Sequence, residues 1–196
     1  MQIRFAVGIF IILAQLFVYV NADYIYGPYA GVVKNVLLVY FILIAVFSPY
    51  VIQILQKIGP QDIPSFSIGF LLTAAVMLVI PNVFSVTGEV EKGLTLALGF
   101  GFLHGLIKAF DEEIIFRGVL PKIMGGSRYA DMVSSVIFGV FHLAVSGANI
   151  FVMFMLMGLG FVWSLMRDRF GLMGSTGSHF AYNLAALKVL PKIFGG

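Results

Sequence analysis

The sequence has no cysteine and little charge of either sign. The absence of cysteine excludes disulfides, thiol nucleophiles and cysteine metal sites. Charged residues make up 11% of the chain, against about 25% in an ordinary soluble domain. Hydrophobic residues make up 60%. This composition is typical of an integral membrane protein, so we expect a lipid bilayer as its surroundings.

The basic residues are scattered rather than clustered. The net charge of +3 comes from isolated lysines and arginines along the chain, which suits loops beside anionic lipid and excludes a nucleic-acid surface. Internal repeats and linkers rich in proline, glycine or serine are also absent. We therefore expect residues 1–196 to form a single transmembrane domain.

Long apolar runs follow one another along the chain. A bilayer core about 30 Å thick needs roughly 20 apolar residues per helix. The runs predict an all-α fold, a polytopic transmembrane helix bundle of about seven spans, or eight. The predicted spans are residues 3–20, 32–55, 66–81, 93–121, 130–146, 148–166 and 172–190. The fourth is too long for one straight span, so we expect it to be tilted or broken.

The first run also has features of a signal peptide, with Arg4, an apolar core and a small-residue ending at Ala22. We favour a retained first span. Cytoplasmic loops are enriched in Lys and Arg, and the bias predicts a cytoplasmic N-terminus. The cytoplasmic set is then Arg4, Lys57, Lys122, Arg128, Arg167 and Arg169, and the outer set is Lys34, Lys92, Lys188 and Lys192. We expect a prokaryotic plasma membrane.

The stretch "DEEIIFRGVL" places three acids inside an apolar run. Ionisable residues within spans cost a few kcal/mol, so they indicate function. Glu113 and Arg117 are four residues apart and can pair on one helix face. Glu112 is turned about 100° away from that pair, which leaves it available for chemistry. Lys108, one turn earlier, is an alternative partner for Glu112.

Two histidines follow in later spans. His142 comes four residues after Phe138, and His179 comes four residues before Asn183. Counted from the nearest charged loop, both histidines and Glu112 lie at a similar depth, roughly 15 Å from the cytoplasmic boundary. Three helices can therefore bring them to one point. One glutamate, two histidines and one asparagine suit the activation of water and the binding of an oxyanion.

Three short motifs occur in order. "EEIIFR" (112–117), "FGVFH" (138–142) and "HFAYN" (179–183) resemble the EExxxR, FxxxH and HxxxN motifs of the CAAX-protease and bacteriocin-processing family of intramembrane glutamate-type peptidases, which includes the CAAX prenyl endopeptidases. The resemblance covers the last half of the chain and places a peptidase core at about residues 93–190. Family members commonly have eight spans.

The resemblance implies an intramembrane endopeptidase and gives each motif residue a role. Glu112 would activate the attacking water with His142. His179 and Asn183 would stabilise the oxyanion, and the supporting residues would be Glu113, Arg117 and Phe138. The implied substrate is a membrane-associated protein or peptide: a prenylated protein, a peptide leader or a C-terminal sorting anchor.

Two alternatives stay open. Glu112, His142 and His179 form a set like the His₂Glu ligands of zinc peptidases, although the HExxH motif is absent. We favour chemistry without a cofactor over Zn²⁺. Buried acids and histidines also serve transporters, immunity proteins and scaffolds, but a transporter spreads its polar groups across the membrane. Here they cluster at one depth.

Overall fold

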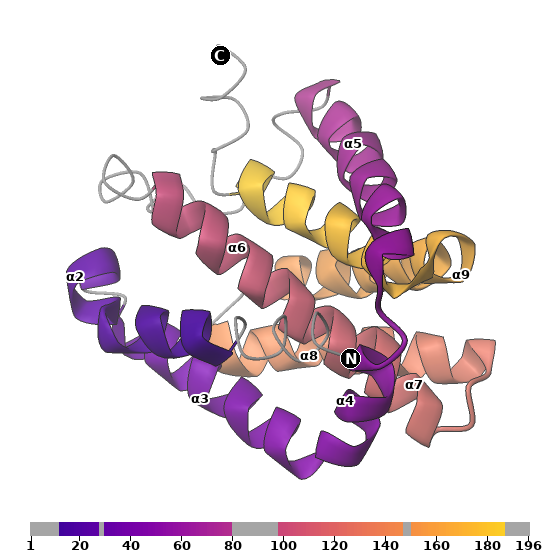
Figure 1. Ribbon diagram of the computed structural model, residues 1–196, viewed down its shortest axis with the longest axis horizontal. Coiled ribbons are helices and arrows are strands. Elements are labelled where there is room, and N and C mark those ends of the chain that lie inside the picture. The colour runs from indigo at the N-terminus through magenta and orange to yellow at the C-terminus, as the bar shows by residue number, and fades with distance from the viewer. Residues whose placement is uncertain (1–11, 28–29, 80–97, 147–149, 187–196) are drawn as a thin grey trace.

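All regular structure in the described part of the chain is helical. The computed structural model describes residues 12–27, 30–79, 98–146 and 150–186. Within these ranges the elements are α-helices with one short 3₁₀-helix and one π-helix, and no strand occurs (Figure 1). The predicted all-α class is therefore confirmed.

The helices fall into an N-terminal group and a C-terminal group. The first comprises a helix over residues 12–20, α2 (Ala22–Tyr26), α3 (Ala30–Val46), α4 (Ser48–Leu55), the 3₁₀-helix η2 (Pro60–Asp62) and α5 (Ile63–Val79). The second comprises α6 (Leu98–Glu113), the π-helix η4 (Ile114–Val119), α7 (Leu120–Ile123), α8 (Arg128–Ser146) and α9 (Ile150–Ala186).

The predicted span 32–55 is a bent pair of helices. Helices α3 and α4 meet at Phe47 with a bend of 87°. Pro49 lies in the first turn of α4, where its missing N–H costs nothing because that donor has no partner within the helix. The proline therefore favours a new helix start at this point, and residues 32–55 form a bent pair of helices rather than one straight helix.

The long fourth segment is broken. Helix α6 ends at Glu113, and the chain continues as the π-helix η4 and then α7, which has Pro121 in its first turn. Residues 93–97 of this predicted span lie outside the described residues. The break follows directly after the three acids, so the irregular turn lies beside the polar cluster.

The last two predicted spans are joined in one element. Helix α9 runs through residues 167–171, which separate the two predicted spans, and is kinked at Gly171, whose φ of 73° and ψ of 174° suit only glycine. A one-residue kink therefore replaces the expected loop. Residues 148–149 and 187–190 of these spans lie outside the described residues.

Fewer helices within the described ranges have the length and hydropathy of a membrane span than the sequence predicts. Within the described ranges, Pro60–Leu78 and Ile150–Ala186 are long and apolar enough to cross a bilayer, and the bent pair Val33–Val46 and Ser48–Leu55 would make a third. Helix α6 has only 16 residues, which is short for a span. The apolar helices nevertheless indicate an integral membrane protein.

Helix α9 is the central packing element, lying against α5, α6 and α8 (Figure 1). Its contact with α5 is a close backbone approach. A Cβ added to Gly177 would lie 2.1 Å from the carbonyl oxygen of Phe66, and one added to Gly69 would lie 1.9 Å from that of Gly174. Small residues at such crossings allow helices to pack closely in membranes. This contact joins the N-terminal helices to the helix that carries His179.

Candidate active site

The three acids lie in the last turn of α6 and are fully buried. Asp111, Glu112 and Glu113 each have a relative exposure of 0%. Charged groups in an apolar interior need partners. The three side chains point to different neighbours because successive helix positions are turned by about 100°. Each acid therefore has its own set of contacts.

Glu112 is surrounded by four polar side chains. Its Oε1 accepts a hydrogen bond of 2.6 Å from the hydroxyl of Tyr40 and lies 3.6 Å from Nε2 of His142 and 3.7 Å from Nζ of Lys108. Its Oε2 lies 3.2 Å from Nε2 of His179. The structure thus brings Glu112, His142 and His179 together from three helices.

The tautomer of neutral His142 follows from its backbone contact. Its Nδ1 lies 2.9 Å from the carbonyl oxygen of Phe138, one turn earlier in α8. A carbonyl oxygen can only accept, so Nδ1 carries the proton and Nε2 of the neutral ring is an acceptor. Nε2 and Glu112 Oε1 are then two acceptors that face one another, an arrangement that a water molecule can bridge by donating to both.

His179 is held by the second glutamate. Its Nδ1 lies 2.9 Å from Glu113 Oε1, and its ring stacks on Trp163 with centroids 3.8 Å apart and planes 15° apart. A carboxylate at Nδ1 requires the proton there, as in catalytic His–Asp pairs. Nε2 therefore faces Glu112 as an acceptor in the neutral ring and as a donor in the imidazolium.

Glu113 and Arg117 form the expected pair, with Nη1 and Oε1 3.6 Å apart. The Arg117 guanidinium also lies over two rings, 4.5 Å from the Phe138 centroid and 5.3 Å from that of Trp163. It makes no hydrogen bond to any side chain or carbonyl of the described residues. The glutamate and the two aromatic faces therefore stabilise this buried cation.

Phe138 and Asn183 lie beside the cluster. Phe138 is completely buried, and its ring centroid lies 4.4 Å from that of His142 and 5.9 Å from that of His179. Asn183 lies one turn after His179, and its Nδ2 donates a 3.2 Å hydrogen bond to the carbonyl oxygen of Gly105. Its amide is thus anchored to α6, and no contact with Glu112 joins it to the cluster.

Sequence reasoning missed three residues of this cluster. Tyr40 and Trp163 were hidden among apolar neighbours, although a phenol or an indole inside a span needs a polar partner. Ser175 was hidden in the small-residue run "GSTGS"; its hydroxyl donates to Glu113, and the Trp163 carbonyl lies 2.9 Å away. Polar atoms in apolar runs were the available signal.

Asp111, which had no expected role, pairs with the first described helix. The Nε2 of Gln15 donates a hydrogen bond to Asp111 Oδ2, and both side chains are buried. The other oxygens of the pair, Gln15 Oε1 and Asp111 Oδ1, have no partner among the described residues. The helix over residues 12–20 is therefore joined to α6 by a buried polar contact as well as by apolar packing.

The π-helix after Glu113 has two carbonyls bonded from other helices. The Ser134 hydroxyl donates to the carbonyl of Phe116, and Arg167 Nη1 donates a 2.9 Å bond to that of Arg117. Arg167 is fixed in turn by two bonds to Asp131, of 2.8 and 2.9 Å. π-Helical turns occur often at functional sites. Here α8 and α9 stabilise the irregular turn.

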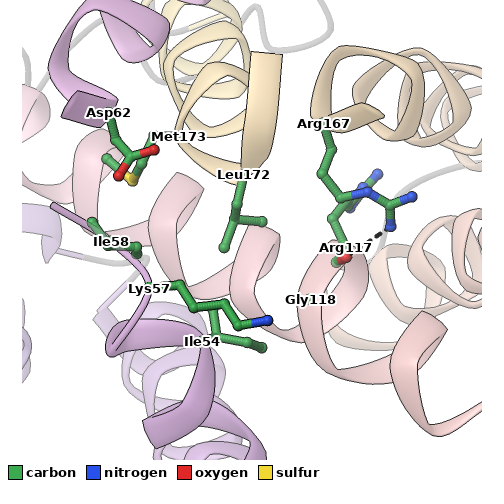
Figure 2. A pocket seen from close by; sticks show the side chains of 9 residues that line it. All are labelled: Ile54, Lys57, Ile58, Asp62, Arg117, Gly118, Arg167, Leu172 and Met173. Carbon is green, nitrogen blue, oxygen red and sulfur yellow. Dashed lines mark hydrogen bonds between the residues drawn. The ribbon is translucent and has the colours of Figure 1, made fainter. Parts of the chain in front are cut away.

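A cleft of about 270 Å³ lies on the other side of η4 (Figure 2). Figure 2 shows it between α4, the kink of α9 and the π-helix, with the bond from Arg167 to Arg117 at one edge. Its lining residues are Ile54, Lys57, Ile58, Asp62, Arg117, Gly118, Arg167, Leu172 and Met173. Arg117 belongs both to this lining and to the polar cluster, whereas the glutamates and histidines of the cluster do not line the cleft, so the cleft adjoins the cluster without containing its acids.

Among the described residues, no group of three or more His, Asp or Glu side chains is arranged to hold a metal ion. The Nδ1 atom of each histidine nevertheless faces an acceptor, which fixes the ring orientation as in many metal sites. The donor set of Glu112, His142 and His179 therefore remains the relevant one for a zinc experiment.

One comparison with known proteins gives a match. Residues 94–185 match the family model described as type II CAAX prenyl endopeptidase Rce1-like. Comparisons with curated proteins and with solved structures gave no match. The matched range contains all three motifs, and the family is one of peptidases that act on membrane-associated proteins. Residues 94–185 are therefore similar to this family of CAAX proteases.

Proposed function

We propose that the protein is an intramembrane endopeptidase that uses Glu112 as a general base and no cofactor. The observation that carries the proposal is the facing pair of acceptors, Glu112 Oε1 and His142 Nε2, 3.6 Å apart. A water bridging them would be oriented by both. Its oxygen would attack the carbonyl carbon of the scissile bond while one proton passes to Glu112.

The carbonyl electron pair then moves to oxygen, and this oxyanion needs donors. Because Glu113 holds the Nδ1 proton of His179, Nε2 donates only when the ring is an imidazolium, which Glu113 and the face of Trp163 stabilise. One Asn183 N–H is bonded to Gly105, and the second is available to the oxyanion. When the C–N bond breaks, Glu112 returns its proton to the leaving amine.

The substrate of the proposed reaction is a membrane-associated protein or peptide. Prenylated C-terminal peptides, peptide leaders and C-terminal sorting anchors all present a peptide bond near the membrane surface. We propose a single-domain bundle of seven spans in a prokaryotic plasma membrane with a cytoplasmic N-terminus. The lysine and arginine distribution supports this orientation.

The test compares protein termini in membranes that carry the wild type or Glu112→Ala. A peptide end that appears only with the wild type identifies the substrate and the bond. Asp23→Ala, at a carboxylate whose side chain is 73% exposed, serves as the control and should match the wild type. Identical sets of peptide ends for wild type and Glu112→Ala would contradict the peptidase proposal and favour a scaffold, immunity or transport protein.

Metal dependence is tested on the same cleavage. We expect purified protein to retain activity after treatment with a chelator. Activity that is lost with the chelator and restored by Zn²⁺ would assign Glu112, His142 and His179 as zinc ligands. In that case the two histidines would bind the metal through Nε2, with Phe138 and Glu113 fixing their Nδ1 protons.

A further inference from the structure

Among the described residues of the N-terminal half, only Tyr40 donates a hydrogen bond to Glu112. Tyr40 lies in α3 with a relative exposure of 1%, and its hydroxyl donates to Glu112 Oε1 over 2.6 Å. Helix α3 precedes the matched range of residues 94–185 by a long segment. The contact therefore brings a residue from outside the family match directly to the acid of the cluster.

The ring of Tyr40 is held independently of its hydroxyl. It packs against Phe141 with centroids 5.7 Å apart and belongs to the apolar cluster that contains Ile115, Phe116, Phe138 and Trp163. Removal of the hydroxyl alone would leave this packing in place. A bond from a buried phenol to a carboxylate is also stronger than a bond between neutral groups.

The bond fixes which way the Glu112 carboxylate turns. With Tyr40 on Oε1, that oxygen also faces His142, and Oε2 is directed to Nε2 of His179 at 3.2 Å. Lys108 also lies near Oε1, but it is 3.7 Å away and its side chain is 31% exposed. Tyr40 is therefore the closer and the more deeply buried of these two donors.

We infer that Tyr40 is a positioning residue that holds the Glu112 carboxylate in the orientation needed to share a water with His142. This inference rests on the proposed function for its consequence in catalysis. It adds a requirement that the three motifs do not contain: the reaction needs a hydroxyl supplied by α3. The N-terminal helices then contribute to the chemistry as well as to the membrane anchor.

The test is Tyr40→Phe, which removes one oxygen atom. On the substrate found by the comparison of termini, we expect kcat to fall by about tenfold, because one charge-assisted hydrogen bond is lost, with KM within about twofold of the wild type. Tyr50→Phe is the matched control. Tyr50 lies in the adjoining helix α4, and its ring rather than its hydroxyl faces Nζ of Lys122 at 5.6 Å. It should keep wild-type kinetics.

A second readout needs no substrate. Trp163 is the only tryptophan of the chain and stacks on His179, so its fluorescence reports on the surroundings of that ring. Glu112→Gln should change the emission intensity measured at a fixed pH. Tyr40→Phe should change it in the same direction by a smaller amount, because the carboxylate facing His179 loses its fixed orientation. Tyr50→Phe should leave the emission unchanged.

The outcomes separate the two proposals. Tyr40→Phe with wild-type kinetics and wild-type emission would overturn the inference, and so would a raised KM with unchanged kcat, since that marks a substrate contact. If Glu112→Ala membranes contain every wild-type peptide end, the peptidase proposal fails. The fluorescence emission of Tyr40→Phe then still decides whether Tyr40 positions Glu112.

Discussion

The two halves of the chain contribute to the site in different ways. Residues 94–185 match the family and contain both glutamates, both histidines and the arginine of the cluster. The helices before residue 80 have no recognisable motif, yet Tyr40 bonds Glu112, Gln15 bonds Asp111, and α5 contacts α9 through its backbone. The matched half thus contains the motif residues that we propose to react, and the other half contacts them and fixes their positions.

The largest effect should come from disrupting the contact between α5 and α9, which joins the two halves of the chain. In Gly177→Leu, a side chain must enter a space where even a Cβ would lie 2.1 Å from the Phe66 carbonyl. Because the backbone of α5 cannot move aside, we expect the free energy of unfolding to fall by about 3 kcal/mol or more. Thermal unfolding of the protein in detergent measures this.

The matched control for this change is Gly158→Leu. Gly158 lies on the same helix, and no atom lies within 4 Å of a Cβ built there. This variant should unfold near the wild-type temperature. Equal unfolding temperatures for Gly177→Leu and the wild type would show that the contact between α5 and α9 does not hold the halves together.

A smaller effect is expected within the matched half. Glu113→Gln keeps the size of the side chain but replaces the carboxylate that faces Nδ1 of His179 at 2.9 Å. Without that charge the imidazolium is less stable, so the proposed oxyanion donor is lost and the rate should fall by about 10²-fold. The kcat on the identified substrate measures it.

The control for the Glu113 change addresses Arg117, which would lose its carboxylate partner at the same time. Arg117→Lys keeps a cation beside Glu113 and leaves His179 bonded, so it should affect stability more than kcat. If Glu113→Gln lowered the unfolding temperature and left kcat unchanged, Glu113 would have a purely structural role.

The smallest effect should come from the polar contact of the first described helix. Gln15→Leu leaves the Asp111 carboxyl buried without a partner, and we expect the free energy of unfolding to fall by about 1–3 kcal/mol. The double variant with Asp111→Leu replaces both partners by apolar groups and should recover most of this stability. Additive losses in the double variant would contradict a direct coupling between Gln15 and Asp111.

The sequence predicted which polar residues lie together better than it predicted the shape of the helices. Helical spacing was sufficient for the pair of Glu113 and Arg117, since partners four residues apart depend only on the helix period. The stacking of Trp163 on His179 could not be predicted in this way. It depends on the kink at Gly171, which lets two parts of α9 face one another.

The contact of Tyr40 with Glu112 also could not be predicted from the sequence. It lies in an almost uniformly apolar run, "VLLVYFILIAV", where no amphipathic pattern shows which face is turned inward. Its hydroxyl marked it as a residue in need of a partner, but the partner lies in a helix distant along the chain. Only the tertiary structure identifies Glu112 as that partner.

The π-helix also constrains how the chain can vary. Its turn contains one residue more than an α-helical turn would need. Removing one of residues 114–116 would place the arginine three positions after Glu113 instead of four. The glutamates would keep their places, but the arginine would leave its position between Phe138 and Trp163. We therefore expect a single-residue deletion between Glu113 and Arg117 to be more harmful than a conservative replacement of an apolar residue there.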